Sequence, residues 1–271
     1  CITKIRDAAF RKGIKVPTYM TKDANVIGWC DFTHNWWLGC TKYSEACAHC
    51  YAESLDKRFG RGSTWGKGAT RKKIHYEQIL KLFKRDKWAR ELGVKILVFA
   101  NSMSDFFDEE VDDQWRDEAF KHIAQTTNTI FQLHTKRAKK AYEVMKDQPK
   151  EITDKIWIGF TVENQKRADE RLPYLNLIDC AQRFISCEPM LSEIDLKLNV
   201  YTNLDWVIGG MESGFYKRRT DPTWIRSLRD QCWLSNVPFY WKQNTDDNGR
   251  YTDKLIDGRK HCDFPDHIAT Y

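Results

Sequence analysis

The sequence predicts an α/β protein built as a partial (β/α) TIM-type barrel of six or seven parallel strands. Short apolar, β-rich runs recur along the chain, and each ends in small or polar residues before a helical pattern begins. The runs are continuous rather than alternating, which indicates strands buried on both faces, as in parallel sheets. An open doubly wound sheet is the alternative, although the glycine fingerprint of dinucleotide binders is absent.

The predicted elements follow one another as strand and helix. A helix over about 112–126 is expected from its apolar stripe of Trp115, Phe120 and Ile123 behind an acidic first turn. Another begins at 220–225, where a capping residue precedes Pro222. The expected strands are 95–100, 129–133, 156–160, 183–186, 204–209 and 237–241, with a further strand around 26–30.

The whole chain, residues 1–271, is expected to be one barrel domain. Residues 67–91 are predicted to be a basic, helical insertion, and residues 244–271 a loop-rich C-terminal tail that packs on the barrel. No run of 18 apolar residues occurs, which argues against a membrane span. Residues 1–7 contain no apolar signal-peptide core, so we expect a cytoplasmic protein.

The charge and the aromatic content bear on the substrate. The net charge of +6 favours an anionic partner. The sequence pI of about 8.7 is below the value above 9 that is typical of dedicated nucleic-acid binders. Eleven Trp, eleven Tyr and fourteen Phe supply the core and leave enough rings to line a pocket that stacks a base.

Three of the nine cysteines, Cys40, Cys47 and Cys50, fall within eleven residues. A secreted disulfide scaffold is usually shorter and more evenly paired, so the cluster indicates metal binding. Two cysteines separated by two residues, with a third seven positions earlier, can hold three corners of a [4Fe–4S] cubane. A structural zinc site would need a fourth ligand, which His49 or His34 can supply.

These cysteines belong to a longer series of motifs. The series resembles a family of radical S-adenosylmethionine (SAM)-like proteins common in phages and prophages, whose members carry a "domain of unknown function" label. Six residues separate Cys40 from Cys47, more than in the commonest radical SAM motif. His49 stands where an aromatic residue usually precedes the third cysteine. The similar segments are 27–35, 39–42, 47–53, 101–105, 135–137, 159–164, 186–189, 209–214, 227–232, 238–239, 242–243 and 255–258.

The resemblance implies a radical-SAM-type barrel that holds a [4Fe–4S] cluster on Cys40, Cys47 and Cys50 and uses SAM. It also implies a reducing electron donor such as flavodoxin or ferredoxin. Radical SAM enzymes bind SAM with loops at the carboxyl ends of the strands, where barrel enzymes keep their chemistry. The candidates at these positions are Ser102, Ser104, Asp105, Lys136, Thr161, Glu163 and Asn164.

Each candidate has an expected role and an alternative. Ser102, Ser104 and Asp105 would bind the methionyl amino group, although helix capping also suits Ser104 and Asp105. Lys136, or its neighbour Arg137, would pair with the methionyl carboxylate. The group Thr161, Glu163 and Asn164 would bind ribose hydroxyls, and helix capping is the alternative.

Later strand ends supply the remaining candidates. Glu188 is a carboxylate at the barrel mouth and needs a partner. Cys187 is either a plain buried thiol or a hydrogen-atom donor to a substrate radical. The predicted catalytic residues are Glu188, Cys187 and Lys242, and the predicted substrate-binding residues are Glu212, Arg218, Arg219 and Gln243.

The expected function is therefore a radical SAM enzyme of isomerase or mutase type. Its predicted substrate is a nucleotide or a hypermodified thymidine base in phage DNA. A radical SAM enzyme acting on a peptide or another small molecule is an alternative. A zinc-stabilised nucleic-acid-binding module without catalysis is the alternative from another class, and it predicts salt-sensitive DNA affinity.

Overall fold

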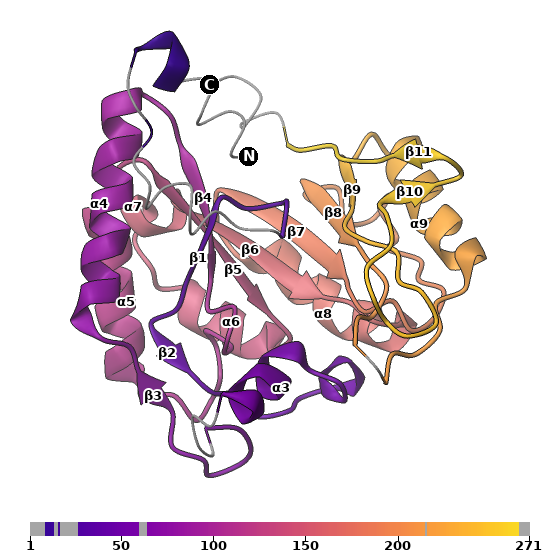
Figure 1. Cartoon of the computed structure of the whole chain (residues 1–271), viewed down its shortest axis with the longest axis horizontal. Helices are drawn as coiled ribbons and strands as arrows, with labels where there is room; N and C mark the ends of the chain where they lie inside the picture. The colour runs from indigo at the N-terminus through magenta and orange to yellow at the C-terminus, as the bar shows by residue number, and fades with distance from the viewer. Residues whose placement is uncertain (1–8, 14–15, 17–26, 60–63, 215, 266–271) are drawn as a thin grey trace.

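The computed structural model describes residues 9–13, 16, 27–59, 64–214 and 216–265. In this described part, one sheet has seven strands in the order β1-β4-β5-β6-β7-β8-β9, and each neighbouring pair is parallel (Figure 1). Strand order follows chain order, as in a barrel, and does not reverse as in a doubly wound sheet. The edge strands β1 and β9 do not pair, so the barrel is partial. The predicted fold class is confirmed.

All six strands expected after the cysteines are present. The further strand predicted around 26–30 was misplaced. Residues 27–31 form a turn and bends, and Val26 lies outside the described residues. Trp29 and Cys30 are buried inside the barrel, which explains why their apolar pattern resembled that of a strand. The strands of the sheet are β1 (Phe32–His34), β4 (Ile96–Ala100), β5 (Thr129–Thr135), β6 (Ile156–Thr161), β7 (Gln182–Cys187), β8 (Trp206–Gly209) and β9 (Phe239–Trp241).

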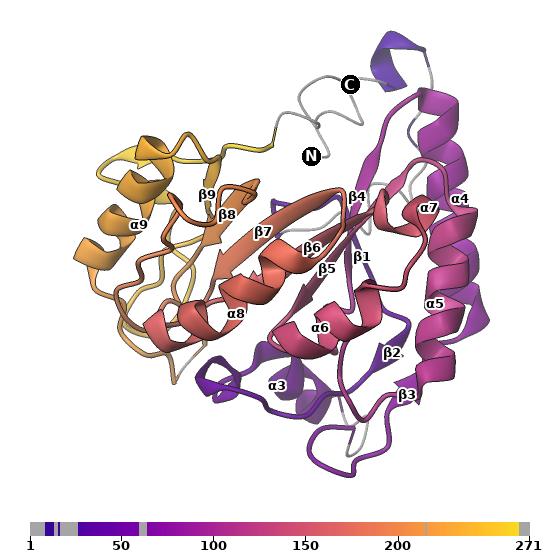
Figure 2. The same ribbon diagram turned by 180° about the vertical axis from the view of Figure 1, so that it is seen from behind.

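Helices cover the outer face of the sheet, where α6 and α8 pack side by side (Figure 2). The two predicted capped helices are confirmed as α5 and α9. The carboxylate of Asp112 accepts the Gln114 N–H, and that of Asp221 accepts the Thr223 N–H. The helices are α3 (Tyr51–Arg58), α4 (Tyr76–Leu92), α5 (Asp113–Gln125), α6 (Ala138–Met145), α7 (Lys150–Thr153), α8 (Gln165–Leu177) and α9 (Pro222–Leu234), with a 3-10 turn η1 at Glu45–Cys47.

Alternation along each strand creates two cores. In β4, Ile96 and Val98 belong to the core between sheet and helices, whereas Leu97 and Phe99 belong to an aromatic core inside the barrel. Successive side chains of a strand point to opposite faces, so both faces of β4 are buried. At Gly159 of β6, a Cβ atom would lie 2.1 Å from the Phe184 ring, so the packing inside the barrel leaves no room for a side chain.

The expected insertion at 67–91 contains most of α4. This helix lies in the connection from β1 to β4, and its Leu82 and Trp88 contribute to the core between sheet and helices. Before it, strand β3 (Lys72–Lys73) pairs antiparallel with β2 (Trp37–Leu38). Most of the exposed lysines of the segment lie on the outer side of the packed helix and on the short strand β3, whereas Arg71 and Arg85 are buried.

The tail after β9 carries the hairpin of β10 (Leu255–Ile256) and β11 (Arg259–Lys260). Beyond it the backbone returns along β9, where the Trp241 N–H donates to the His261 carbonyl and the Asp263 N–H donates to the Phe239 carbonyl. Within the described residues, no helix has the length and apolar character needed to cross a membrane.

Candidate functional site

The cysteine loop, defined here as residues 39–50, begins beside the loop that follows β4. The Gly39 N–H donates to the Met103 carbonyl at 3.1 Å. Gly39 has φ +99°, and a Cβ atom there would lie 2.2 Å from the Thr64 carbonyl oxygen. Only glycine meets both the left-handed conformation and the close approach. This position therefore determines where Cys40 enters the site.

The three clustered cysteines line one cavity of about 570 Å³ at the carboxyl ends of the strands. Cys40 is buried, whereas Cys47 and Cys50 are partly exposed. Burial raises the pKa of the Cys40 thiol to about 12, an effect that Asp105 increases and Arg137 opposes. Thiolate is the form that binds metal, so a metal ion that binds Cys40 displaces a proton.

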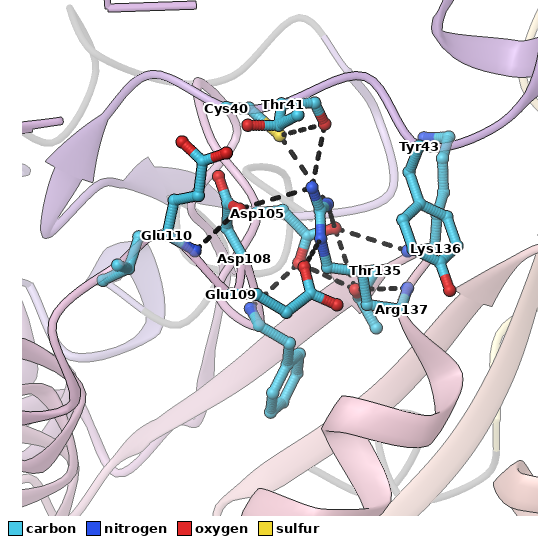
Figure 3. Close-up of polar contacts among 12 residues, drawn as sticks. Cys40, Thr41, Tyr43, Asp105, Asp108, Glu109, Glu110, Thr135, Lys136 and Arg137 are labelled. Carbon is cyan, nitrogen blue, oxygen red and sulfur yellow. Dashed lines mark hydrogen bonds and ion pairs between the residues drawn. The ribbon is translucent and has the colours of Figure 1, made fainter. Parts of the chain in front are cut away.

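Arg137, the residue before α6, joins the cysteine loop to the loop that follows β4 (Figure 3). A guanidinium has five N–H groups. All five are engaged, by the Thr41 carbonyl (2.8 Å), Cys40 Sγ (3.8 Å), Asp105 Oδ2 (3.0 Å), Asp108 Oδ1 (3.4 Å) and Glu109 Oε2 (2.6 Å). Lys136 and Arg137 are the two cations that were expected to pair with a ligand carboxylate. Arg137 is occupied in holding the loops together, which leaves Lys136 for that pairing.

Asp105 is a second centre of this network. Its carboxylate accepts from the Thr135 hydroxyl at 2.7 Å and from the Phe107 N–H at 2.9 Å, in addition to Arg137. Burial acts to raise the pKa of Asp105, but Arg137 and these two donors outweigh burial, and the pKa lies below its ordinary value. Asp105 is therefore an ionised carboxylate that lines the cavity and ties the ends of β4 and β5 together.

The middle of the cysteine loop is anchored by Glu163, which follows β6. This carboxylate is fully buried and pairs with Arg171 Nη1 at 2.8 Å. It also accepts from the Ser44 hydroxyl and from the Ala46 N–H at 3.4 Å. Glu163 does not line the cavity, so the expectation that it binds a cofactor ribose is not supported by its position.

The same middle part of the cysteine loop is held by two more arginines. Glu45 pairs with Arg167 Nε of α8 at 2.9 Å, and its carbonyl accepts from Arg218 Nη1 at 2.9 Å. Arg218 in turn pairs with Glu212, whose Oε2 lies 3.5 Å from His49 Nδ1. Contacts with arginines and with the carboxylates of Glu163 and Glu212 thus hold the loop in place before any ligand binds.

Most of the predicted site residues surround the same cavity, although the loops that carry them are far apart in the chain. Two of the hydroxyls already have partners, since Ser102 accepts from Asn35 Nδ2 at 3.2 Å and Ser104 donates to the Trp37 carbonyl at 2.9 Å. The predicted residues that line the cavity are Cys40, Cys47, Cys50, Ser102, Ser104, Asp105, Lys136, Thr161, Glu188, Glu212, Lys242 and Gln243.

The other predicted residues lie outside the cavity lining, and the structure corrects their expected placement. Cys187 is fully buried on the helix side of β7, because side chains alternate along a strand and its neighbour Ser186 takes the inner face. Asn164 caps α8, its Oδ1 accepting the Arg167 N–H at 3.0 Å. Glu163 and Arg218 hold the cysteine loop, and Arg219 is exposed.

A half-buried polar cluster forms another part of the wall. Lys242 Nζ lies 2.5 Å from Glu188 Oε1, and Gln243 Nε2 donates to the same oxygen at 2.8 Å. Gln243 also donates to the Met211 carbonyl at 2.8 Å, which fixes its side chain. Such a cluster can orient a polar ligand.

Lys136 is the cavity cation that remains available. Its ammonium forms no ion pair with the residues that the structure describes. Burial acts to lower the pKa of Lys136, but Cys47, Cys50, Glu163 and Asp105 outweigh it and raise the pKa. Lys136 therefore stays protonated beside the cysteines, ready for an anionic group.

The donor set suits a thiolate-held metal group in its chemistry. Three thiols from one loop share a cavity with a protonated lysine, and His49 also lines it, whereas His34 does not. Among the described residues, no three His, Cys, Asp or Glu side chains are gathered closely enough to hold a metal ion. The three sulfur atoms would therefore have to draw together around a bound group.

His134 also lines the cavity, but it was not among the site residues predicted from the sequence. It lies on the inner face of β5, and its Nε2 is 2.9 Å from Thr161 Oγ1. Burial lowers the pKa of His134 to about 3, so the ring is neutral. The signal that could have found it is strand alternation, because His134 shares the inner face with Gln132.

The fold and the site together define a partial (β/α) barrel whose cysteine loop lies at the carboxyl ends of its strands. The chain belongs to the family described as protein of unknown function (DUF5131), whose model matches residues 24–265. This agrees with the unknown-function family that the motifs resemble. No curated protein matches the sequence significantly.

Two solved structures align with much of this chain. A spore photoproduct lyase variant with bound AdoMet and dinucleoside spore photoproduct aligns with a TM-score of 0.42 and 11% identity, over 84% of this chain and 78% of that chain. Spore photoproduct lyase complexed with dinucleoside spore photoproduct aligns with a TM-score of 0.44 and 11% identity, over 77% of this chain and 62% of that chain. Both scores are below 0.5, so neither match bears on the activity of this chain.

Proposed function

We propose that this chain is a radical SAM enzyme that modifies or rearranges a nucleotide or a hypermodified thymidine base in phage DNA. Cys40, Cys47 and Cys50 would hold a [4Fe–4S] cluster, and a flavodoxin or ferredoxin would deliver the electron. When bound, the cluster would supply that electron to SAM, whose cleavage gives methionine and a 5′-deoxyadenosyl radical. The carrying observation is that the three thiols line one cavity with polar residues from the ends of consecutive parallel strands.

The residues of the chain prepare this chemistry. Lys136 is placed to bind the carboxylate of SAM, because it is protonated and has no acidic partner within the described part. Thr161 offers a hydroxyl on the same wall, and Asp105 keeps the neighbouring loops in position. Arg137 fixes the cysteine loop, so that little ordering remains to be done when ligands bind.

The Glu188–Lys242 pair and Gln243 would serve the substrate. A carboxylate and an ammonium at 2.5 Å can exchange a proton with a substrate group as its charge changes. The Gln243 side chain is held by Met211 and would orient a polar substituent. An isomerase or mutase outcome is consistent with this arrangement, because rearrangement needs positioning and exclusion of water rather than a second co-reactant.

Iron content tests the proposal. Protein prepared without air should be brown and contain about four iron and four sulfide per chain, as a cubane cluster requires. Cys40→Ala, Cys47→Ala and Cys50→Ala should each abolish iron binding. Cys262→Ala is the matched control and should keep it, because Cys262 is exposed and lies outside the cavity.

Stoichiometric zinc in a folded protein from which iron has been excluded would reject the cluster and favour the zinc-stabilised binding module. Cleavage is tested separately with dithionite and SAM, which should yield 5′-deoxyadenosine slowly alone and faster with the true substrate. Substrate accelerates the step by positioning, which contributes up to about 7–11 kcal/mol in favourable cases. Acceleration by peptides alone would keep the enzyme class and reject the nucleotide substrate.

A further inference from the structure

The cavity residues without a role in the function proposed above include Trp29, Phe99, His134 and Lys254. Three of them are rings inside the barrel. The centroids of Trp29 and Phe99 are 4.8 Å apart, and those of Phe99 and His134 are 6.1 Å apart. Phe184 contacts both Trp29 and His134, at 6.3 Å and 5.7 Å. The rings therefore form one continuous aromatic surface at the cavity.

This surface carries uncharged hydrogen-bonding groups. His134 Nε2 is engaged with Thr161, whereas Nδ1 has no partner among the described residues. A neutral imidazole presents one donor and one acceptor nitrogen, so Nδ1 offers a directional bond without charge. The indole N–H of Trp29, a residue that is only 4% exposed, likewise has no partner in the described part of the chain.

Lys254 brings a positive charge to the same place from the C-terminal tail. Its Nζ lies 3.4 Å from the Tyr240 hydroxyl, and a Cβ atom on Gly28 would be 2.9 Å from it. The ammonium is therefore next to the chain neighbour of Trp29. It forms no ion pair with a carboxylate of the described residues, which leaves it free to bind an anion.

We propose that Trp29, Phe99, His134 and Lys254 form the subsite for a nucleotide, with the uncharged base against the three rings and the phosphate at Lys254. Bases stack on aromatic side chains, and an ammonium is a suitable point charge for phosphate. His134 reads an edge of the base through a hydrogen bond. The inference rests on the proposed function and deepens it, because it assigns the substrate class to named residues.

Calorimetric titration of the full chain with thymidine 5′-monophosphate, thymidine and inorganic phosphate tests the subsite. Each titration is run without SAM and repeated with saturating SAM. A pyrimidine nucleotide is chosen because an adenine nucleotide could enter the site proposed for SAM. The monophosphate should bind more tightly than thymidine, and inorganic phosphate more weakly than both.

Lys254→Gln should weaken the binding of the monophosphate about tenfold and leave the affinity for thymidine unchanged, since a bond to a charged group is lost. His134→Asn should weaken the binding of the monophosphate and of thymidine by the same factor. Lys260→Gln is the matched control, because Lys260 is an exposed lysine of the same tail outside the cavity. It should change neither affinity, and unchanged melting temperatures should accompany the two lysine variants.

An equal loss of affinity for thymidine and for the monophosphate in Lys254→Gln would overturn the assignment of Lys254 to the phosphate. Loss of nucleotide binding when SAM is added would assign the ring surface to the cofactor and reject the proposal. The two proposals fail separately. Absent 5′-deoxyadenosine with nucleotide binding retained rejects the radical chemistry alone, and 5′-deoxyadenosine without nucleotide binding rejects the subsite alone.

Discussion

At the scale of single residues, Arg137 connects two loops through five N–H groups bonded to five different residues. Arg137→Gln would leave the buried Asp105 and Asp108 without their shared cation. Removing one partner of a buried ion pair costs about 3–5 kcal/mol, and we expect the free energy of unfolding in urea to fall by that amount. Lys139→Gln breaks only an exposed pair with Glu143 and should stay within about 0.5 kcal/mol.

Gly39 and Gly258 provide a matched pair of glycines. Both have positive φ, but only Gly39 has a neighbour where a Cβ atom would be placed. Each alanine variant should lose roughly 1–2 kcal/mol for the left-handed conformation. Gly39→Ala should lose more and should also reduce the iron content, because the Thr64 carbonyl must move and Cys40 with it. Equal stability and iron content in the two variants would contradict this role.

At the scale of elements, substitution of Asn164 at the start of α8 distinguishes a role in helix capping from a role in ligand binding. Asn164→Ala should lower the free energy of unfolding by about 0.5–2 kcal/mol, the usual cost of removing an N-cap. Its affinity for SAM, measured by equilibrium dialysis, should not change, because Asn164 faces the Arg167 N–H and not the cavity. Asn164→Asp keeps an acceptor and should restore stability. Weaker SAM binding in the alanine variant would instead favour a contact with the ribose.

The elements also show which patterns in the sequence were sufficient to predict the secondary structure. Continuous apolar runs predicted β4 to β9, because a strand buried on both faces is mostly apolar. The same rule misplaced the first strand, since Trp29 and Cys30 are apolar for a different reason and pack inside the barrel from a bend. Side chains were harder to predict. Glu163 and Arg218 are charged residues near the site, and only the structure shows that they bind the cysteine loop.

At the scale of the whole molecule, two buried histidines connect stability to pH. Burial lowers the pKa of His34 and of His134 to about 3, from an ordinary value of 6.5. Below pH 6.5 the unfolded chain takes up protons at these residues, and the folded chain does not until about pH 3. The free energy of unfolding should therefore fall as pH falls, by at most about 1.4 kcal/mol per pH unit for each histidine.

Urea midpoints at pH 7, 6 and 5 measure this dependence. His134→Asn should reduce the slope by the share of one histidine. A slope that is the same in His134→Asn and in the unmodified chain would show that His134 takes up its proton in the folded state.

The tail backbone along β9 has a consequence for the behaviour of the protein at high concentration. An open sheet has two edges, and an edge strand with free N–H and carbonyl groups is a template for pairing with another copy. Residues 261–263 occupy this position at β9 through the bonds to Trp241 and Phe239. Chains cut before residue 261 should therefore lose solubility through edge-to-edge aggregation, even where their barrel remains folded.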